Sequence, residues 1–379
     1  MPQRFGYALF FVALISTNLL SAQPTGPSPV AFVYVSSSTG NNSYQINAFA
    51  ADASGRLTMV AGSPFAGNTQ SVAVNQHYLF GTDGVYIYSF AIAPDGTLTP
   101  AASVNAQGFN DDGCGGPVGL FLDRAGTTLY DPDYYANICA NNTYQFFNVS
   151  NPSGDLSYLG MSDPSALFDV SLSFTGNNLY AYGATSYHME PDIFGFRRND
   201  DGSLTLLPID PPMPKAPSGQ FYDPYLTAAD GANHVAISVQ PYDANTWQPS
   251  GPAQFATFTA DNSGNLSTQS NYSNMPATAV GYVSDLAMSL SGQFLAVAGT
   301  TGLQVFKFNG ASPITPFTQL LAHAPITQLS WDASNHLYAI SSTGKLFVFT
   351  VTAASVGVYE APGSPYAVTS PQGIAVLSK

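Results

Sequence analysis

Two aspartates stand where a carboxylate could act on a bound molecule. Asp169 and Asp285 each come directly before a short run of apolar and small residues, Val170-Ser-Leu172 and Leu286-Ala-Met288. A carboxylate can take a proton from water and so activate it for attack on a carbonyl carbon. Two carboxylates together can also hold a divalent cation such as calcium. The alternative is that each side chain caps its own strand or binds a neighbouring backbone amide.

A second candidate is the cluster His188-Met-Glu190-Pro-Asp192. Alternate side chains of an extended chain point the same way, so His188 and Glu190 would lie together. They would form a general base with its orienting carboxylate, or two ligands of a divalent metal. A solvated loop without chemistry is the alternative, because spacing identifies no further ligand.

Aromatic residues form a third candidate. Tyr134 follows Asp131-Pro-Asp133, and further along the chain stand Tyr225, Tyr242 and Trp247. Oxygen-rich and aromatic side chains together suit calcium binding or stacking on a sugar ring. Tyrosine is also common in strands of ordinary structural function.

Other catalytic signatures are absent from the sequence. We find no Gly-rich phosphate loop, nucleophile elbow, zinc motif or EF-hand loop. Serine-based catalysis therefore has no support. The remaining histidines are isolated, and we expect them to have structural roles.

The elements that position these residues follow from an internal repeat. The stretch 87–98 reads as a hairpin, with an apolar strand, the turn Pro94-Asp-Gly96 and a second strand opening at Leu98. Seven copies occur, marked by phenylalanines spaced 41 to 62 residues apart: Phe49, Phe90, Phe147, Phe196, Phe258, Phe306 and Phe349. A period near 50 residues built from short strands predicts an all-β, seven-bladed β-propeller with four-stranded antiparallel blades.

The innermost strand of each blade has its own template. We expect these strands at 71–74, 119–122, 169–172, 225–228, 285–288, 328–331 and 371–377. The first strand, Val30 to Val35, has no inner strand before it, whereas the last stretch matches that template. The ring should therefore close by pairing of the C-terminal strand with the N-terminal strands, which protects sheet edges.

Strand direction sorts the loops into two faces. The short Asp, Asn, Ser and Gly turns fall on one face, and the connections between blades fall on the other with the loops between second and third strands. The longer loops of that second face are 107–117, 131–143, 183–192, 208–223 and 240–254. Because variable loops on a rigid scaffold carry most binding sites, we expect the site there, over the central channel.

Composition restricts the partners. Only 8% of the residues are charged and the net charge is −14. Nucleic acid and anionic membranes are improbable partners, since both need clustered Lys and Arg. The only basic pair, Arg197-Arg198, is explained by a solvated strand position. We expect a monomer that binds a small lactone, a glycan or a protein on its loop-rich face.

The N-terminus predicts export. Arg4, the apolar run 8–15 and the small residues Ser21-Ala22 are typical of a signal peptide over residues 1–22. A linker over 23–29 would precede the propeller at 30–379, and no later stretch could span a membrane. The protein should therefore be secreted or periplasmic. There Cys114 and Cys139 would form a disulfide, and the alternative is two unpaired buried thiols.

The repeat units and the connectors Ala61-Gly-Ser-Pro-Phe65 and Pro362-Gly-Ser-Pro-Tyr366 resemble the seven-bladed lactonase-type propellers. This group includes 6-phosphogluconolactonase-like and carboxymuconate-cyclising enzymes. The resemblance covers the mature chain and implies a lactone hydrolase. The histidine that these enzymes commonly place before an inner strand is missing here, and the presumed site face offers only Lys215 and Lys345 as cations for a phosphate.

Two functions follow. The first is hydrolysis of a non-phosphorylated lactone by channel-mouth carboxylates, with or without a divalent cation such as calcium. The second is a non-catalytic propeller of the cell envelope that binds a glycan or a protein. An enzyme should bring two or more carboxylates together, whereas a binder should present an open aromatic or polar surface.

Overall fold

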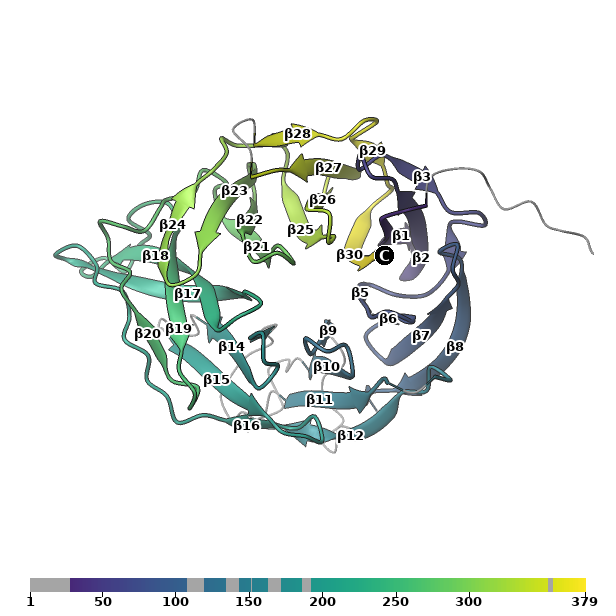
Figure 1. Cartoon of the computed structure of the whole chain (residues 1–379), viewed down its shortest axis with the longest axis horizontal. Helices are drawn as coiled ribbons and strands as arrows, with labels where there is room; N and C mark the ends of the chain where they lie inside the picture. Colours follow the sequence, from purple (N-terminus) through teal and green to yellow (C-terminus); the bar gives the residue numbers. More distant parts are fainter. Residues whose placement is uncertain are drawn as a thin grey trace, which may run out of the picture.

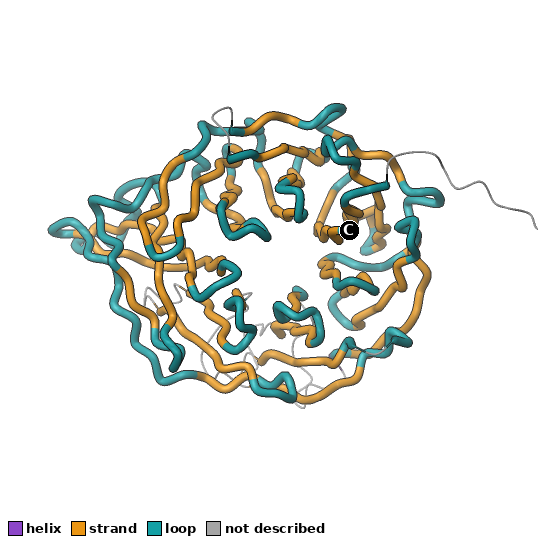
Figure 2. The backbone as a smooth tube through the Cα atoms, viewed as in Figure 1, coloured by secondary structure: helices purple, strands orange, loops and turns teal. Residues whose placement is uncertain are grey.

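A computed structural model describes residues 28–107, 119–133, 143–150, 152–162, 172–185, 192–353 and 357–379. Seven antiparallel sheets surround a central opening (Figure 1). The described residues form strands, turns and loops, with no α-helix among them (Figure 2). The prediction of an all-β, seven-bladed propeller is confirmed.

The first four blades run in chain order from the channel outward. Blade 1 consists of β5 (Ser71–Val74), β6 (Tyr78–Thr82), β7 (Tyr86–Ile92) and β8 (Leu98–Asn105). Blade 2 consists of β9 (Phe121–Leu122), β10 (Thr128–Asp133), β11 (Thr143–Asn148) and β12 (Ser157–Ser162). Blade 3 consists of β13 (Ser173–Phe174), β14 (Tyr180–Thr185), β15 (Asp192–Arg198) and β16 (Leu204–Leu206). Blade 4 consists of β17 (Gln220–Ala229), β18 (His234–Asp243), β19 (Gln254–Ala260) and β20 (Leu266–Thr268).

The remaining blades complete the ring. Blade 5 consists of β21 (Val283–Met288), β22 (Phe294–Gly299), β23 (Gly302–Asn309) and β24 (Ser312–Pro316). Blade 6 consists of β25 (Ile326–Trp331), β26 (His336–Ser341), β27 (Lys345–Val351) and β28 (Val358–Glu360). Blade 7 consists of β30 (Pro371–Ser378), β1 (Ala31–Gly40), β2 (Ser43–Ala51) and β3 (Leu57–Met59). The two connectors singled out in the sequence form the extra strands β4 (Phe65–Ala66), which pairs with β2, and β29 (Tyr366–Ala367), which pairs with β27.

Blade 7 joins the two ends of the chain. Strand β30 pairs with β1 in antiparallel register, with Val376 opposite Val33 and Ile374 opposite Val35. The C-terminus consequently lies beside β1 (Figure 1). The predicted ring closure is confirmed, and it places the first strand, β1, between β30 and β2, so that β1 is not an open edge.

The repeat phenylalanines form the core. Each of the seven marker phenylalanines is at most 5% exposed. Burial of one phenylalanine side chain stabilises a fold by roughly 1.5–3 kcal/mol. The leucine that follows the turn glycine is buried in the clear copies as well, at Leu57, Leu98, Leu204 and Leu266. The repeat motif is therefore mainly a packing motif.

Two of the differences from the predicted boundaries bear on the site. In blade 3 the described inner strand β13 begins at Ser173, later than the predicted 169–172, of which residues 169–171 lie outside the described residues. In blade 4 the hairpin is longer than predicted, because Gln220 pairs with Asp243 and Phe221 with Tyr242. Parts of the predicted loops 208–223 and 240–254 are therefore strand, and this strand pair extends beyond the inner-strand start at Tyr225.

The solvated role predicted for the basic pair is wrong for Arg198. Its Nε lies 3.1 Å from Oδ2 of Asp123, and the two side chains are 14% and 0% exposed. Its Nη2 also donates to Thr128 at 2.7 Å. Arg198 of blade 3 is thus bound to the buried turn of blade 2, whereas Arg197 is exposed. No helix among the described residues is long and apolar enough to cross a membrane.

Candidate functional site

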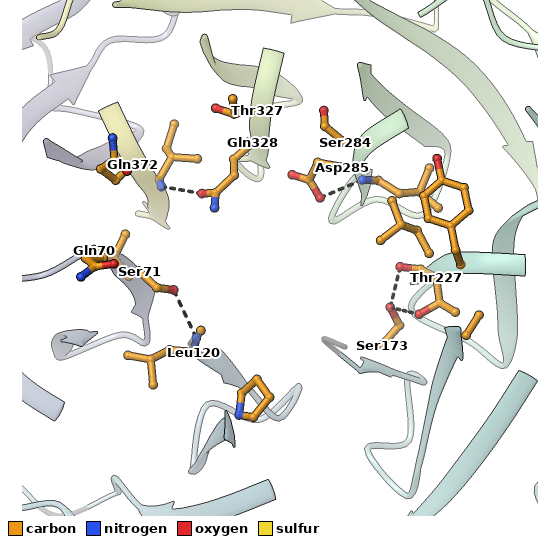
Figure 3. A pocket seen from close by; sticks show the side chains of 18 residues that line it. Gln70, Ser71, Leu120, Ser173, Thr227, Ser284, Asp285, Thr327, Gln328 and Gln372 are labelled. Atoms are coloured by element: carbon orange, nitrogen blue, oxygen red, sulfur yellow. Dashed lines mark hydrogen bonds between the residues drawn. The ribbon is translucent and has the colours of Figure 1, made fainter. Parts of the chain in front are cut away.

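The central opening holds a cavity of about 690 Å³ at the end where the inner strands begin. We call this end the channel mouth. All seven blades contribute lining residues, and most of the side chains are hydroxyl, amide or aliphatic groups. Figure 3 shows the polar ones around the opening: Gln70, Ser71, Ser173, Thr227, Ser284, Asp285, Thr327, Gln328 and Gln372. A volume of this size suits a small molecule.

The channel changes character along its length. A second cavity of about 430 Å³ lies further along the inner strands and is lined mainly by apolar side chains, among them Val74, Phe174, Met288 and Trp331. A hydroxyl-rich ligand would therefore meet complementary groups at the channel mouth and not in the apolar part.

One hydrogen-bond relation recurs between neighbouring blades at the channel mouth. A polar side chain near the start of one inner strand accepts a hydrogen bond from a backbone N–H near the start of the inner strand in the next blade. Leu120 donates to Oγ of Ser71 at 3.2 Å, Leu329 to Oδ2 of Asp285 at 2.7 Å, and Ile374 to Oε1 of Gln328 at 3.1 Å. We call these three contacts the interblade bonds.

The interblade bonds have a simple cause. An inner strand is the edge of its sheet, so some of its backbone N–H groups face the channel without a partner strand. A buried N–H group needs an acceptor, and a polar side chain of the preceding blade supplies one. The polar residues at these positions thus hold the ring together as well as lining the cavity.

Asp285 is the only charged side chain among the described lining residues. Its Oδ1 accepts a hydrogen bond of 2.7 Å from the backbone N–H of Leu286, and its Oδ2 accepts the interblade bond from Leu329. Burial raises the pKa of Asp285 to about 6, although the two backbone hydrogen bonds act in the opposite direction. At neutral pH this carboxylate is mostly ionised and is a stronger base than an ordinary aspartate.

Gln328 supplies a hydrogen-bond donor beside Asp285. Its Oε1 is used by the interblade bond to Ile374, and within the described part of the chain its Nε2 has no partner. Figure 3 shows both Gln328 and Asp285 projecting into the opening from neighbouring blades. The channel mouth therefore combines one base with one amide donor.

Several predicted site residues lie outside the described residues: Asp169, His188, Glu190, Tyr134, Cys114 and Cys139. Their predicted roles in catalysis, metal binding, substrate binding and a disulfide stay predictions.

The described aromatic candidates occupy two places. Tyr225 lines the cavity, and its hydroxyl donates to the carbonyl oxygen of Val283 in blade 5 at 3.1 Å. Tyr242 and Trp247 do not line the cavity. They belong to the extended end of blade 4, where Phe221 contacts both of their rings. Tyr222, in contrast, is only 3% exposed and packs in the core.

A metal site is not formed by the described residues alone. Among them, no three His, Cys, Asp or Glu side chains gather in a way that could hold a metal ion. Of the predicted pair of carboxylate ligands, Asp285 lines the cavity and Asp169 lies outside the described residues. The calcium hypothesis therefore stays a prediction.

The charge of the channel mouth bears on the substrate class. No Lys, Arg or His lines the cavity among the described residues. The adjoining segments 108–118, 134–142, 163–171 and 186–191 contain neither Lys nor Arg in the sequence. A phosphate group would therefore lack the charge-assisted hydrogen bonds that usually bind it.

Sequence reasoning missed Ser71 and Gln328. Each is the first residue of a predicted inner strand, as Asp285 is. The prediction counted only carboxylates and histidines at that position as groups able to do chemistry. A recurring polar residue at the start of an innermost strand was the available signal. Only the order of the strands in the sheets shows which backbone N–H group each of these side chains reaches.

Comparison with known proteins bears on the fold. No protein-family model matches the sequence. A search of curated proteins finds no match.

Solved structures do match. A "putative 6-phosphogluconolactonase" from Bacteroides uniformis superposes with a TM-score of 0.65 at 13% identity, covering 92% of this chain and 99% of that one. A second "putative 6-phosphogluconolactonase", from Bacteroides fragilis, gives 0.60 at 14% identity over 94% and 100%. A protein from Lactobacillus plantarum gives 0.64 at 14% identity over 92% and 100%. At these identities the likeness shows the fold alone: the chain is a seven-bladed propeller similar in structure to these three proteins, two of which are described as "putative 6-phosphogluconolactonase".

Proposed function

We propose that this protein is a lactonase-like propeller that binds a small, non-phosphorylated lactone at the channel mouth and hydrolyses it. The observation that carries the proposal is the pair formed by Asp285 and Gln328. Asp285 is a partly buried carboxylate, with its pKa raised to about 6, that lines a cavity of about 690 Å³. Gln328 presents an amide N–H group from the neighbouring blade.

The reaction follows from these two groups. A water molecule attacks the carbonyl carbon of the lactone while Asp285 accepts one of its protons. The carbonyl oxygen becomes an oxyanion, to which Nε2 of Gln328 donates a hydrogen bond. The tetrahedral intermediate collapses with cleavage of the ring C–O bond, and Asp285 returns its proton to the departing ring oxygen. The product is a hydroxy acid, and Asp285 is regenerated as a carboxylate.

The lining indicates the class of lactone. Hydroxyl and amide side chains such as Ser71, Thr227 and Gln372 suit a ligand that carries hydroxyl groups. Cations are missing from the described wall, and Asp285 adds a negative charge, so both features disfavour a phosphorylated substrate. An uncharged sugar lactone therefore fits best. Export of the protein, which belongs to this proposal, would let it meet such a compound outside the cytoplasm.

The test uses the purified protein and unphosphorylated glucono-1,5-lactone together with simple γ- and δ-lactones. Release of acid is followed with a pH indicator against the spontaneous rate in the same buffer. We expect an enzymatic rate that Asp285→Asn lowers at least 100-fold, since general base catalysis contributes 10²–10⁴-fold. Asp83→Asn is the control, because Asp83 is a carboxylate that does not line the cavity.

Two results would count against hydrolysis by Asp285. One is a rate equal to the spontaneous rate for every lactone. The other is an Asp285→Asn variant as active as the wild type, with its fold verified by circular dichroism.

A second function has a specific observation in its favour. Asp285 is a single carboxylate among the described lining residues, so the convergence of two carboxylates expected for an enzyme is not seen in that part of the chain. A non-catalytic propeller would bind a glycan in the same cavity. Calorimetric titration with 1,5-anhydroglucitol, a cyclic polyol without a cleavable bond, separates the two functions. Saturable binding without hydrolysis of any lactone would favour the binding protein.

A further inference from the structure

The hairpin of β17 and β18 extends beyond the predicted inner-strand start. Both strands are ten residues long, and Tyr225, at the predicted inner-strand start, is the sixth residue of β17. A strand rises about 3.3 Å per residue, so Phe221 lies at most about 13 Å along the strand from Tyr225, where the register shifts between Pro224 and Leu226. The register of this strand pair fixes which side chains of blade 4 lie opposite each other beyond Tyr225.

Aromatic rings line this extension. Phe221 and Tyr242 are direct cross-strand partners, with ring centroids 5.5 Å apart and planes 17° apart. Trp247 follows in the next turn, and its ring lies 5.2 Å from that of Phe221. Nearer the cavity, Tyr225 stacks on Tyr282 of the following connection, with centroids 6.0 Å apart. We call these five residues the aromatic ridge.

The aromatic ridge presents its rings to solvent at both ends. Tyr282 is 73% exposed and Trp247 is 46% exposed. Burial raises the pKa of Tyr242, and the charges of Asp223 and Tyr282 raise it further. Because Tyr225 also lines the cavity, the ridge continues the channel mouth outward.

The conformation of Trp247 adds a second observation. Its φ is +56°, a region that bulky residues rarely adopt and that costs free energy. The turn holds it there: its N–H donates to the carbonyl oxygen of Asp243, whose Oδ1 accepts from the N–H groups of Asn245 and Thr246. The indole of Trp247 is exposed and does not pack in a core, so core packing does not explain the strained backbone. We therefore expect the ring to serve in binding.

The surroundings indicate the chemistry of the partner. Amide residues stand near the ridge residues in the chain at Gln220, Asn245 and Gln248, and the sequence has no Lys or Arg between Lys215 and Lys307. Acidic polymers would meet only repulsion from a chain of net charge −14. Aromatic faces between amide groups match a sugar ring, which has an apolar C–H face and a rim of hydroxyl groups. A protein partner is less well matched, because exposed aliphatic side chains are few on this hairpin.

We propose that the aromatic ridge is a binding surface for an uncharged glycan chain that enters at the channel mouth. One sugar unit would lie against Tyr225 and Tyr282, and units further along the chain would stack on Tyr242 and Trp247. The ridge meets the cavity only at Tyr225 and includes neither Asp285 nor Gln328, so glycan binding does not depend on the proposed reaction.

The two tryptophans make a direct test available. Trp331, the other tryptophan of the chain, is only 5% exposed and its indole N–H donates to the carbonyl oxygen of Ala287. In a Trp331→Phe background the fluorescence reports Trp247 alone. The probes are cellopentaose, xylopentaose, maltopentaose and the pentamer of N-acetylglucosamine, with pentagalacturonate as the acidic comparison.

We expect at least one neutral pentamer to shift the emission of Trp247 to shorter wavelength in a saturable way, and its monomer to bind at least tenfold more weakly. In the wild-type background, Trp247→Ala should weaken calorimetric binding of that pentamer at least tenfold. Tyr359→Ala, which removes a 52% exposed tyrosine from blade 6, should leave the affinity unchanged. Asp285→Asn should also retain pentamer binding, so failure of hydrolysis and failure of the glycan surface are distinguishable.

The proposal is overturned if no neutral pentamer shifts the emission, or if folded Trp247→Ala binds as tightly as the wild type. Preference for pentagalacturonate would overturn the assignment to an uncharged glycan. A shift produced by a proline-rich peptide and by none of the sugars would assign the surface to a protein partner.

Discussion

The hydroxyl group of Tyr130 donates a hydrogen bond of 2.7 Å to the carbonyl oxygen of Gly202. Tyr130 is fully buried in β10 of blade 2, and Gly202 lies in the turn between β15 and β16 of blade 3. The same bond recurs twice, from Tyr34 to Gly96 at 3.1 Å and from Tyr182 to Gly264 at 2.9 Å. In three of the four clear copies of the repeat, the motif glycine is therefore the acceptor of a tyrosine from the preceding blade.

Removal of this hydroxyl should weaken the junction of two blades. Tyr130→Phe leaves the carbonyl oxygen of Gly202 without its donor in a buried place, which costs about 1–2 kcal/mol. Urea unfolding should show a lower midpoint at unchanged slope. Tyr359→Phe alters a 52% exposed ring and should leave the midpoint within error. Equal midpoints for all three proteins would show that the hydroxyl contributes nothing.

Substitutions at two glycines distinguish the cost of a positive φ from the cost of steric overlap with a neighbouring side chain. Gly40 and Gly96 have φ of +93° and +86°, but a Cβ on Gly40 would meet nothing within 4 Å, whereas one on Gly96 would lie 2.5 Å from the ring of Phe32. Gly40→Ala should cost about 1 kcal/mol from its φ alone. Gly96→Ala should cost about 1–3 kcal/mol more, because Phe32 is fully buried and must shift. Comparable unfolding midpoints for the two variants would contradict the packing argument.

The pKa of Asp285 has a consequence for stability. Its value in the folded state, about 6, is above that of an unfolded aspartate, so the folded protein binds the proton more tightly. The resulting stabilisation is present in full below about pH 4 and is lost as the pH rises through about 6. Relative to wild type, Asp285→Asn should therefore gain about 2–3 kcal/mol between pH 4 and pH 7, at two pKa units of about 1.4 kcal/mol each.

Asp95 provides a control of opposite sign. Hydrogen bonds from Thr97 lower the pKa of Asp95, so its contribution is present above the unfolded pKa and is lost as the pH falls. Asp95→Asn should therefore lose stability relative to wild type as the pH rises. Denaturant titrations at several pH values measure both differences. A pH-independent offset for Asp285→Asn would show that the carboxylate titrates as it does in water.

The same group should set the pH dependence of hydrolysis. The carboxylate form of Asp285 is the base, so the rate after subtraction of spontaneous hydrolysis should rise with pH and level off above about 6. Initial rates from pH 4 to pH 7 measure the profile. A rate that falls over this range would assign an acid, not a base, to the rate-limiting step.

A metal chelator tests how Asp285 acts. Its two oxygens already accept hydrogen bonds from Leu286 and Leu329, which suits a base acting without a metal. Treatment with EDTA should then leave the rate unchanged. Loss of activity that calcium restores would instead identify Asp285 as a ligand. In that case calorimetry should show saturable calcium binding that an Asp169→Asn and Asp285→Asn double variant lacks.

Much of the fold could be predicted because its determinants repeat. The pattern of Phe90, a turn and Leu98 recurs, and each copy must bury the same face. The number of copies therefore gives the number of blades. Pairing of β30 with β1 followed from one missing inner strand and one surplus strand. The extended hairpin of blade 4 was missed because Phe221 and Tyr242 read as loop residues until cross-strand pairing places them opposite each other.

The sequence by itself determined the seven blades, the ring closure and the scarcity of cations, since these depend on local periodicity and on composition. Only the tertiary structure decided what Asp285 contacts. Its acceptor role toward Leu329 joins residues 44 positions apart, and its pKa of about 6 depends on burial by neighbouring blades. Burial and hydrogen bonding are properties of the assembled ring, because each inner strand obtains its missing acceptors from the blade beside it.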